Sequence, residues 1–215
     1  MKKQNNPGNG KYWAIGTQKS KWISGARNHI GFLCIVAVIV LLILWMFGTY
    51  NSLVSLQEGV HNTWADVETQ YQRRADLIPN LVETVKGYAT HEKTLFEDVA
   101  KMRSAWTSAK DSGNLDQEMV AARGLDGALG RLLAVAENYP DLKANQNFLA
   151  LQDQLEGTEN RVAVARTRYN EAVRDYNMKT KRVPGNLITN WFGFMEEKYF
   201  EAQEGSEEVP FVKFT

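Results

Sequence analysis

The stretch LVSLQEGVHNTWADVETQYQRRADLIPNLVETV, residues 53–85, decides the fold class of this chain. Its apolar residues recur at intervals of three and four, which places them on one face of an α-helix. They are Leu53, Leu56, Val60, Trp64, Val67, Tyr71, Ile78, Leu81 and Val85. Pro79 falls inside this pattern, and because proline lacks a backbone N–H we expect a helix kink or break there.

The same helical spacing continues towards the C-terminus, interrupted by turn residues. We predict further helices over residues 95–106, 115–136, 141–183 and 187–200. No segment shows sustained period-two alternation. The sequence therefore predicts an all-α fold, with an N-terminal transmembrane helix followed by an elongated antiparallel helical bundle of long helices.

The transmembrane prediction rests on residues 30–48, IGFLCIVAVIVLLILWMFG, which are 19 consecutive uncharged residues. As a helix they would extend for about 28 Å, close to the hydrocarbon thickness of a bilayer. Trp45 and Tyr50 stand near the end of the run, where aromatic rings favour the headgroup region. Cys34 lies inside the run rather than after it, and no small-residue cleavage pattern follows. We expect an uncleaved anchor over residues 30–50.

Charge is distributed unevenly along the chain. Six of the 25 basic residues and none of the 25 acidic residues lie in 1–29, so the chain after residue 50 has a net charge of −6. The positive-inside rule then places the N-terminus in the cytoplasm and the rest of this single-pass protein on the other side of the membrane. A net-acidic domain does not suit nucleic acid. The single cysteine excludes an intramolecular disulfide and a zinc site of several thiolates.

These observations divide the chain into four parts. Residues 1–29 form a basic cytoplasmic tail that we expect to be disordered, and residues 30–50 form the anchor. Residues 51–203 form the helical bundle, and residues 204–215 an extended C-terminal tail.

Several segments together resemble the LemA family. They are Tyr50–Val54, the run RRADLIPNLVETVKGYATHE over residues 73–92, Tyr169–Glu171, Tyr176-Asn177, Pro184, Phe192–Phe194 and Tyr199-Phe200. The resemblance covers residues 50–215 in the family's order. It implies a single-pass protein of a bacterial inner membrane, with a helical bundle in the periplasm or outside the cell. It implies no established catalytic activity. The tail before the anchor is longer than the resemblance leads us to expect.

No catalytic motif is visible in the sequence. His91-Glu92 begins like a zinc-protease motif, but Leu95 stands where the second histidine would be. Patterns for a serine or cysteine nucleophile and for a phosphate-binding loop are absent from the sequence. We therefore expect no enzyme activity, no cofactor and no metal.

Charged and amide side chains surround Pro79. Arg73, Arg74, Asp76 and Asn80 could form an anion or partner site where the proline exposes backbone groups. The structural alternative is an ion pair between Arg73 or Arg74 and a carboxylate on the 141–183 helix, with Asn80 satisfying the carbonyl that the proline frees. The structural alternative is favoured.

Two Tyr-Asn pairs, Tyr169-Asn170 and Tyr176-Asn177, are seven residues apart and so share one helical face. Asn170 and Asn177 are predicted to bond backbone groups or fix the register between helices, with a polar ligand cleft as the alternative.

Aromatic residues gather in the last predicted helix. An apolar stripe is formed by Leu187, Ile188, Trp191, Phe194, Met195 and Tyr199, and the rings of Phe192 and Phe200 lie beside it. We expect this stripe to pack against the bundle. The alternative is an interface for a partner, a second copy or the outer leaflet of the membrane.

Three classes of function remain. The first is a membrane-anchored, non-catalytic scaffold or adaptor that contacts the membrane and either a protein partner or further copies of itself. The second is a ligand-sensing or signalling module with a polar site in the bundle. The third, a hydrolase, ranks last because no nucleophile and base are paired in the sequence. The sequence favours the first.

Overall fold

The computed structural model describes the backbone of residues 16–201 and the side chains of residues 31–201. Within that range it contains six helices and no strand, so the all-α prediction is confirmed. The chain divides into two compact units, with the boundary between Ser52 and Leu53. The helices are α1 (Gly16–Lys86), α2 (Lys93–Ser112), α3 (Leu115–Ala136), α4 (Pro140–Lys143), α5 (Gln146–Lys181) and α6 (Gly185–Phe192).

In the N-terminal unit, α1 contains a strongly apolar segment. Large apolar side chains from Phe32 to Phe47 are exposed, and an 18-residue window here has a mean hydropathy of 2.9 with none of its residues buried. Among the described residues this is one helix long and apolar enough to cross a membrane, in agreement with the predicted anchor. Exposed apolar side chains of this density suit a lipid environment.

α1 begins earlier than the sequence led us to expect. Residues 16–29, which we assigned to a disordered tail, are helical. Once the apolar segment has formed a helix, each added residue extends it without a new nucleation cost, and residues 16–29 contain no proline to stop it. Residues 1–15 and the predicted extended tail, 204–215, lie outside the described part of the chain.

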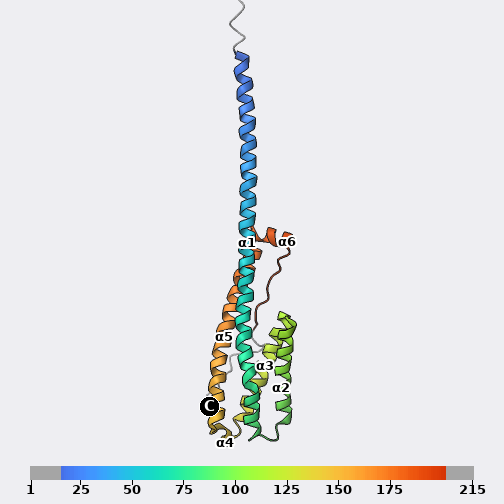
Figure 1. Cartoon of the computed structure of the whole chain (residues 1–215), viewed down its shortest axis with the longest axis vertical. Coiled ribbons are helices and arrows are strands. Elements are labelled where there is room, and N and C mark those ends of the chain that lie inside the picture. Colours follow the sequence, from blue (N-terminus) through green and yellow to red (C-terminus); the bar gives the residue numbers. More distant parts are fainter. Residues whose placement is uncertain (1–15, 202–215) are drawn as a thin grey trace, which may run out of the picture. The chain divides into compact units, whose positions relative to one another are not determined.

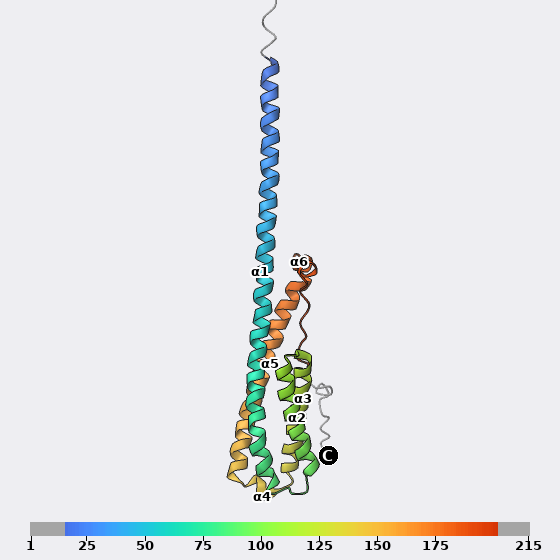
Figure 2. The same cartoon turned by 45° about the vertical axis from the view of Figure 1, so that its right-hand side comes forward.

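The C-terminal unit is a helical bundle (Figures 1 and 2). The ring of Trp64 in α1 lies 5.2 Å from that of Tyr169 in α5, and Arg74 further along α1 contacts Glu159 earlier in α5, so the two helices are antiparallel. α2 and α3 form a hairpin that turns at Gly113, whose φ of +62° favours glycine. The largest fully buried side chains include Trp106, Tyr71, Tyr169 and Tyr176.

The helix predicted over 141–183 is interrupted near its start. α4 is a single short turn, and α5 begins at Gln146 because Asn145 caps it. The Asn145 side-chain oxygen accepts hydrogen bonds from the backbone N–H groups of Asn147 at 2.9 Å and Phe148 at 3.1 Å.

The last helix is shorter than predicted. α6 ends at Phe192, and Gly193 follows with a φ of +75° and donates its N–H to the Thr189 carbonyl at 2.9 Å. This left-handed cap stops the helix. Residues 194–201, which we expected to be largely helical, have no regular secondary structure and run as an extended segment beside α5. We call residues 194–201 the C-terminal segment.

Candidate functional site

Arg74 is buried and joins three helices. Its guanidinium donates hydrogen bonds to Asp126 of α3 and Glu159 of α5. Arg166 of α5 also donates to Asp126 and to the hydroxyl of Tyr71, which in turn donates to Asp126 at 2.8 Å. The structural alternative, an ion pair between Arg73 or Arg74 and a carboxylate on the helix predicted over 141–183, is confirmed for Arg74, whose partner Glu159 lies in α5. We call these five residues the charge network.

Burial opposes the charges in this network. Desolvation lowers the pKa of Arg74 and lowers that of Arg166 to about 10. It also raises the pKa of Asp126 to about 6, although the neighbouring Arg74 acts in the opposite direction. Two guanidinium groups face two carboxylates, so each buried charge has a partner of opposite sign. Such a network is costly to break, because removing one partner leaves a buried charge without its counter-charge.

Arg73 and Asp76 lie on the exposed surface and do not take part in the charge network. Asp76 accepts a hydrogen bond from Gln72 at 2.8 Å. Arg73 and Asp76 line a pocket of about 510 Å³ together with Asp153 and Arg161 of α5. Two basic and two acidic side chains line this pocket, which therefore has no clear preference for an anion.

Pro79 does not end its helix, because α1 continues to Lys86. Proline has no N–H to offer to the carbonyl of Ala75, four residues earlier. The Nε of Arg103, in α2, donates to that carbonyl at 3.1 Å. Our expectation that Asn80 satisfies it is wrong, because the Asn80 side chain is exposed and a cation from another helix makes the bond. The bend at Pro79 stays a prediction.

Asn170 and Asn177 hold the C-terminal segment. Asn177 donates to the Glu197 carbonyl at 2.8 Å and accepts from the Glu197 N–H at 2.9 Å. Asn170 binds the Phe200 carbonyl and N–H in the same way, at 3.0 and 2.8 Å. Each asparagine thus satisfies both polar groups of one residue, and we call the two together the amide clamp. The predicted bonding to backbone groups is confirmed, but the partner is an extended segment rather than a helix.

The tyrosines beside these asparagines add to the clamp. Tyr176 donates to the Met195 carbonyl and Tyr169 to the Lys198 carbonyl, both at 2.8 Å. Seven residues of α-helix rise about 10.5 Å, and three residues of extended chain span about 10 Å. Glu197 and Phe200 are three residues apart, so the distance between them along the segment matches the distance between Asn177 and Asn170 along α5. Each asparagine therefore lies opposite the residue that it binds.

Phe200 links the clamp to the charge network. Its buried ring stacks on Trp64 and Tyr71, with centroids 6.1 and 6.4 Å apart. The guanidinium carbon of Arg166 lies 4.4 Å from the centroid of the same ring. The C-terminal segment therefore completes the core as well as covering α5.

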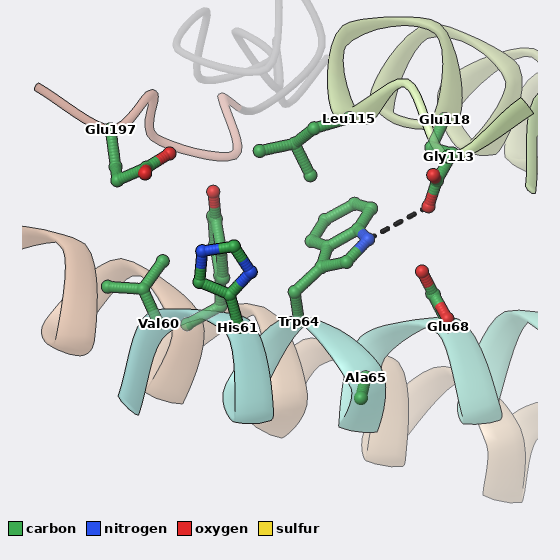
Figure 3. A pocket seen from close by; sticks show the side chains of 10 residues that line it. Val60, His61, Trp64, Ala65, Glu68, Gly113, Leu115, Glu118 and Glu197 are labelled. Carbon is green, nitrogen blue, oxygen red and sulfur yellow. Dashed lines mark hydrogen bonds between the residues drawn. The ribbon is translucent and has the colours of Figure 1, made fainter. Parts of the chain in front are cut away.

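A pocket of about 290 Å³ lies beside Trp64 (Figure 3). The indole N–H of Trp64 donates to Glu118 at 2.8 Å. Burial raises the pKa of Glu118 to about 7, and a hydrogen bond and charge repulsion from Glu68 add to the shift. His61 and Glu197 also line the pocket. Within residues 31–201 no group of three His, Cys, Asp or Glu side chains is placed to hold a metal ion.

The aromatic residues of the predicted interface are largely exposed. Exposure is 82% for Trp191, 50% for Phe192 and 44% for Tyr199, whereas Phe194 packs partly against the core. Packing of the whole stripe against the bundle is therefore wrong, and only part of it is buried. Within α6 the face that packs inward is that of Gly185, Ile188 and Thr189, which leaves Trp191 and Phe192 outside. Tyr199 lies beyond Gly193, where the chain has left the helix, and so no longer shares a helical face with them.

Residues 63–214 match the LemA family. The chain belongs to the LemA family. Similar proteins include magnetosome protein MamQ 2 of Paramagnetospirillum magneticum, 28% identical over 201 residues that cover 83% of this chain and 72% of the relative. Magnetosome protein MamQ of Magnetospirillum gryphiswaldense is 25% identical with the same coverage. Protein LemA of Metamycoplasma hominis is 20% identical over 181 residues, covering 84% of this chain and 82% of the relative. With the apolar helix, these similarities describe a membrane-associated helical protein.

Sequence reasoning about this LemA family protein missed several residues of the site. Asp126 and Arg166 of the charge network, Glu118 at the pocket and Arg103 beside Pro79 were not singled out. Asp126 carried a signal, because it interrupts an apolar helical face between Leu125 and Leu129. Arg166, Glu118 and Arg103 carried none, since their contacts depend on how the helices pack.

Proposed function

We propose that this LemA family protein is a single-pass membrane protein whose bundle acts as a non-catalytic scaffold or adaptor. One observation carries the proposal. The polar residues best suited to a site, Arg74, Asn170 and Asn177, are engaged in contacts within the bundle, whereas Trp191 and its neighbours expose apolar surface. Rigid internal bonding with an exposed apolar patch is what an interaction protein needs.

The proposal includes an orientation. The basic tail lies in the cytoplasm and the bundle on the other side of a bacterial inner membrane, in the periplasm or outside the cell. The six basic residues before the anchor support this orientation. It is tested by labelling intact cells with a membrane-impermeant thiol reagent on a Cys34→Ser chain that carries a single cysteine at exposed Asn138. Labelling before lysis is expected, and labelling only after lysis would reverse the orientation.

The scaffold role is tested by the particle mass of the full-length chain in nanodiscs and mild detergent, combined with crosslinking in the native membrane. One chain has a mass of 24.4 kDa. We expect either a discrete multiple of that mass or a defined crosslinked partner. A chain that stays a monomer at every concentration and crosslinks to nothing would contradict a scaffold.

A second candidate function is ligand sensing, favoured by the pocket at Trp64. Its aromatic ring and the carboxyl groups of Glu68 and Glu118 suit a small organic cation. The test compares the melting temperature in tetramethylammonium chloride with that in sodium chloride at equal ionic strength. A higher melting temperature in the tetramethylammonium salt, with no such difference in the Glu68→Gln variant, would support ligand sensing. Equal melting temperatures in the two salts would rule out binding of a small organic cation at this pocket.

A further inference from the structure

Four large apolar side chains near the C-terminus are exposed at a spacing of four residues. They are Val183, Leu187, Trp191 and Met195, with 74%, 60%, 82% and 79% of their surfaces exposed. Leu187 and Trp191 both belong to α6 and lie one turn apart on the same face. An isolated exposed leucine needs no explanation, but a row of this kind that includes a tryptophan indicates a surface covered by something apolar.

The outward direction of Leu187 and Trp191 is fixed by the opposite face of α6. Gly185, Ile188 and Thr189 are buried. A Cβ atom on Gly185 would lie 1.9 Å from the Lys179 carbonyl oxygen, so this end of α6 approaches the backbone of α5 too closely for any other residue. α6 therefore cannot turn Leu187 and Trp191 inward without leaving α5.

Cations stand immediately before the row. Residues 183–195 contain no charged residue, whereas Lys179, Lys181 and Arg182 precede them within four positions. Lys181 pairs with Glu196 at 2.9 Å, and within residues 31–201 neither Lys179 nor Arg182 forms an ion pair. Tryptophan and other large apolar residues on one side, with lysine and arginine beside them, are the composition of helices that lie in the membrane interface.

The position of α6 within the C-terminal unit fits the same environment. α1 and α5 are antiparallel, so the end of α5 lies at the level of Leu53, and Figure 2 shows α6 at the end of the bundle opposite α4. In the sequence, Leu53 follows the end of the apolar run at Gly48 by five residues. Five residues reach at most about 17 Å. The chain itself therefore keeps this end of the bundle near the membrane.

We propose that α6, with Val183 and Met195 on either side of it, binds the surface of a bilayer that contains anionic lipids. Leu187 and Trp191 enter the headgroup region, and Lys179 and Arg182 contact the anionic headgroups. A second copy fits this surface less well, because a twofold contact would bring the cations of both copies into one interface. The proposal goes beyond the scaffold role and does not depend on it.

The test measures the depth of α6 in the membrane. A full-length Cys34→Ser chain with a single cysteine at Leu187 is labelled with an environment-sensitive fluorophore and placed in nanodiscs. The discs hold one chain each and consist of phosphatidylcholine alone or of phosphatidylcholine and phosphatidylglycerol at a ratio of 7 to 3. A cysteine at Asn138, exposed after α3 at the other end of the bundle, is the matched control.

In the anionic discs we expect the Leu187 label to shift to shorter wavelength and to be quenched by spin-labelled lipid, while the Asn138 label stays in water. Arg182→Gln should lower the ratio of bound to free α6 about fivefold, the effect of one cation near an anionic surface. The melting temperature should not change, because Arg182 is exposed. A label that stays in water in both lipids would overturn the proposal. So would equal binding in neutral discs, or protection that appears only when a disc holds two chains.

Discussion

At the scale of single residues, Arg73 and Arg74 show how one position along a helix decides the role of a side chain. Arg74 faces α3 and α5 and is buried with its carboxylates, whereas Arg73 is exposed. The two residues have the same chemistry and differ in direction by about 100° around the helix. Their substitution should therefore have very different costs.

Arg74→Met should lower the free energy of unfolding by about 3–5 kcal/mol, because it leaves Asp126 buried with a single remaining cation. Arg73→Met should change it by less than about 0.5 kcal/mol. Denaturant unfolding of the full-length protein in detergent measures both. Equal effects of the two substitutions would mean that the charge network does not stabilise the bundle.

Glu118 should make stability depend on pH. Its pKa in the folded protein, about 7, is above its ordinary value, so the folded state binds the proton more tightly than the unfolded state. The resulting stability is fully present below about pH 4.5 and is lost as the pH rises through 7. The melting temperature of the protein should therefore fall between pH 5 and pH 8. In the Glu118→Gln variant this fall should be smaller by about 2–5 °C. Glu171→Gln, at an exposed position, is the control and should leave the fall unchanged.

At the scale of elements, periodicity predicted the helices and the anchor, because a buried helical face imposes a regular pattern on the sequence. It did not predict the break before Gln146 or the end of α6 at Phe192. Those depend on single capping residues, Asn145 and Gly193, within apolar patterns that continue past them. The role of Arg103 was also beyond prediction, since it depends on how α2 packs on α1.

The bond from Arg103 compensates for Pro79, and a double-mutant cycle should show the coupling. Arg103→Met should cost about 1 kcal/mol in the presence of Pro79, because it removes the donor to the Ala75 carbonyl. In a Pro79→Ala chain the alanine N–H can take that role, and the cost should fall towards zero. The same cost in both backgrounds would show that Arg103 acts through other contacts.

The amide clamp should control the C-terminal segment as one unit. Asn177→Ala removes two hydrogen bonds to Glu197 and should speed amide exchange about tenfold at both Glu197 and Phe200. Asn80→Ala, at an exposed position, should change neither rate. Hydrogen exchange by NMR or mass spectrometry measures these rates. Faster exchange at Glu197 alone would mean that the two asparagines act independently.

At the scale of the whole molecule, the boundary between Ser52 and Leu53 separates a unit built for lipid from a unit with its own core. We expect a fragment of residues 53–215 to fold without the anchor and to show a cooperative thermal transition by circular dichroism. It should nevertheless fail to replace the full-length protein in a deletion strain, because the proposed scaffold acts at the membrane and the fragment has no anchor. Rescue by the fragment would contradict this.

The match between α5 and the C-terminal segment limits how this part of the chain can change in length. Deleting or inserting one residue between Glu197 and Phe200 would leave one asparagine opposite the wrong backbone group and would also withdraw the Phe200 ring from Trp64 and Arg166. The rise of α5 between Asn170 and Asn177 therefore sets the length of chain that must lie between Glu197 and Phe200. The clamp makes no demand on an exposed side chain such as that of Tyr199, but it fixes the number of residues between Glu197 and Phe200.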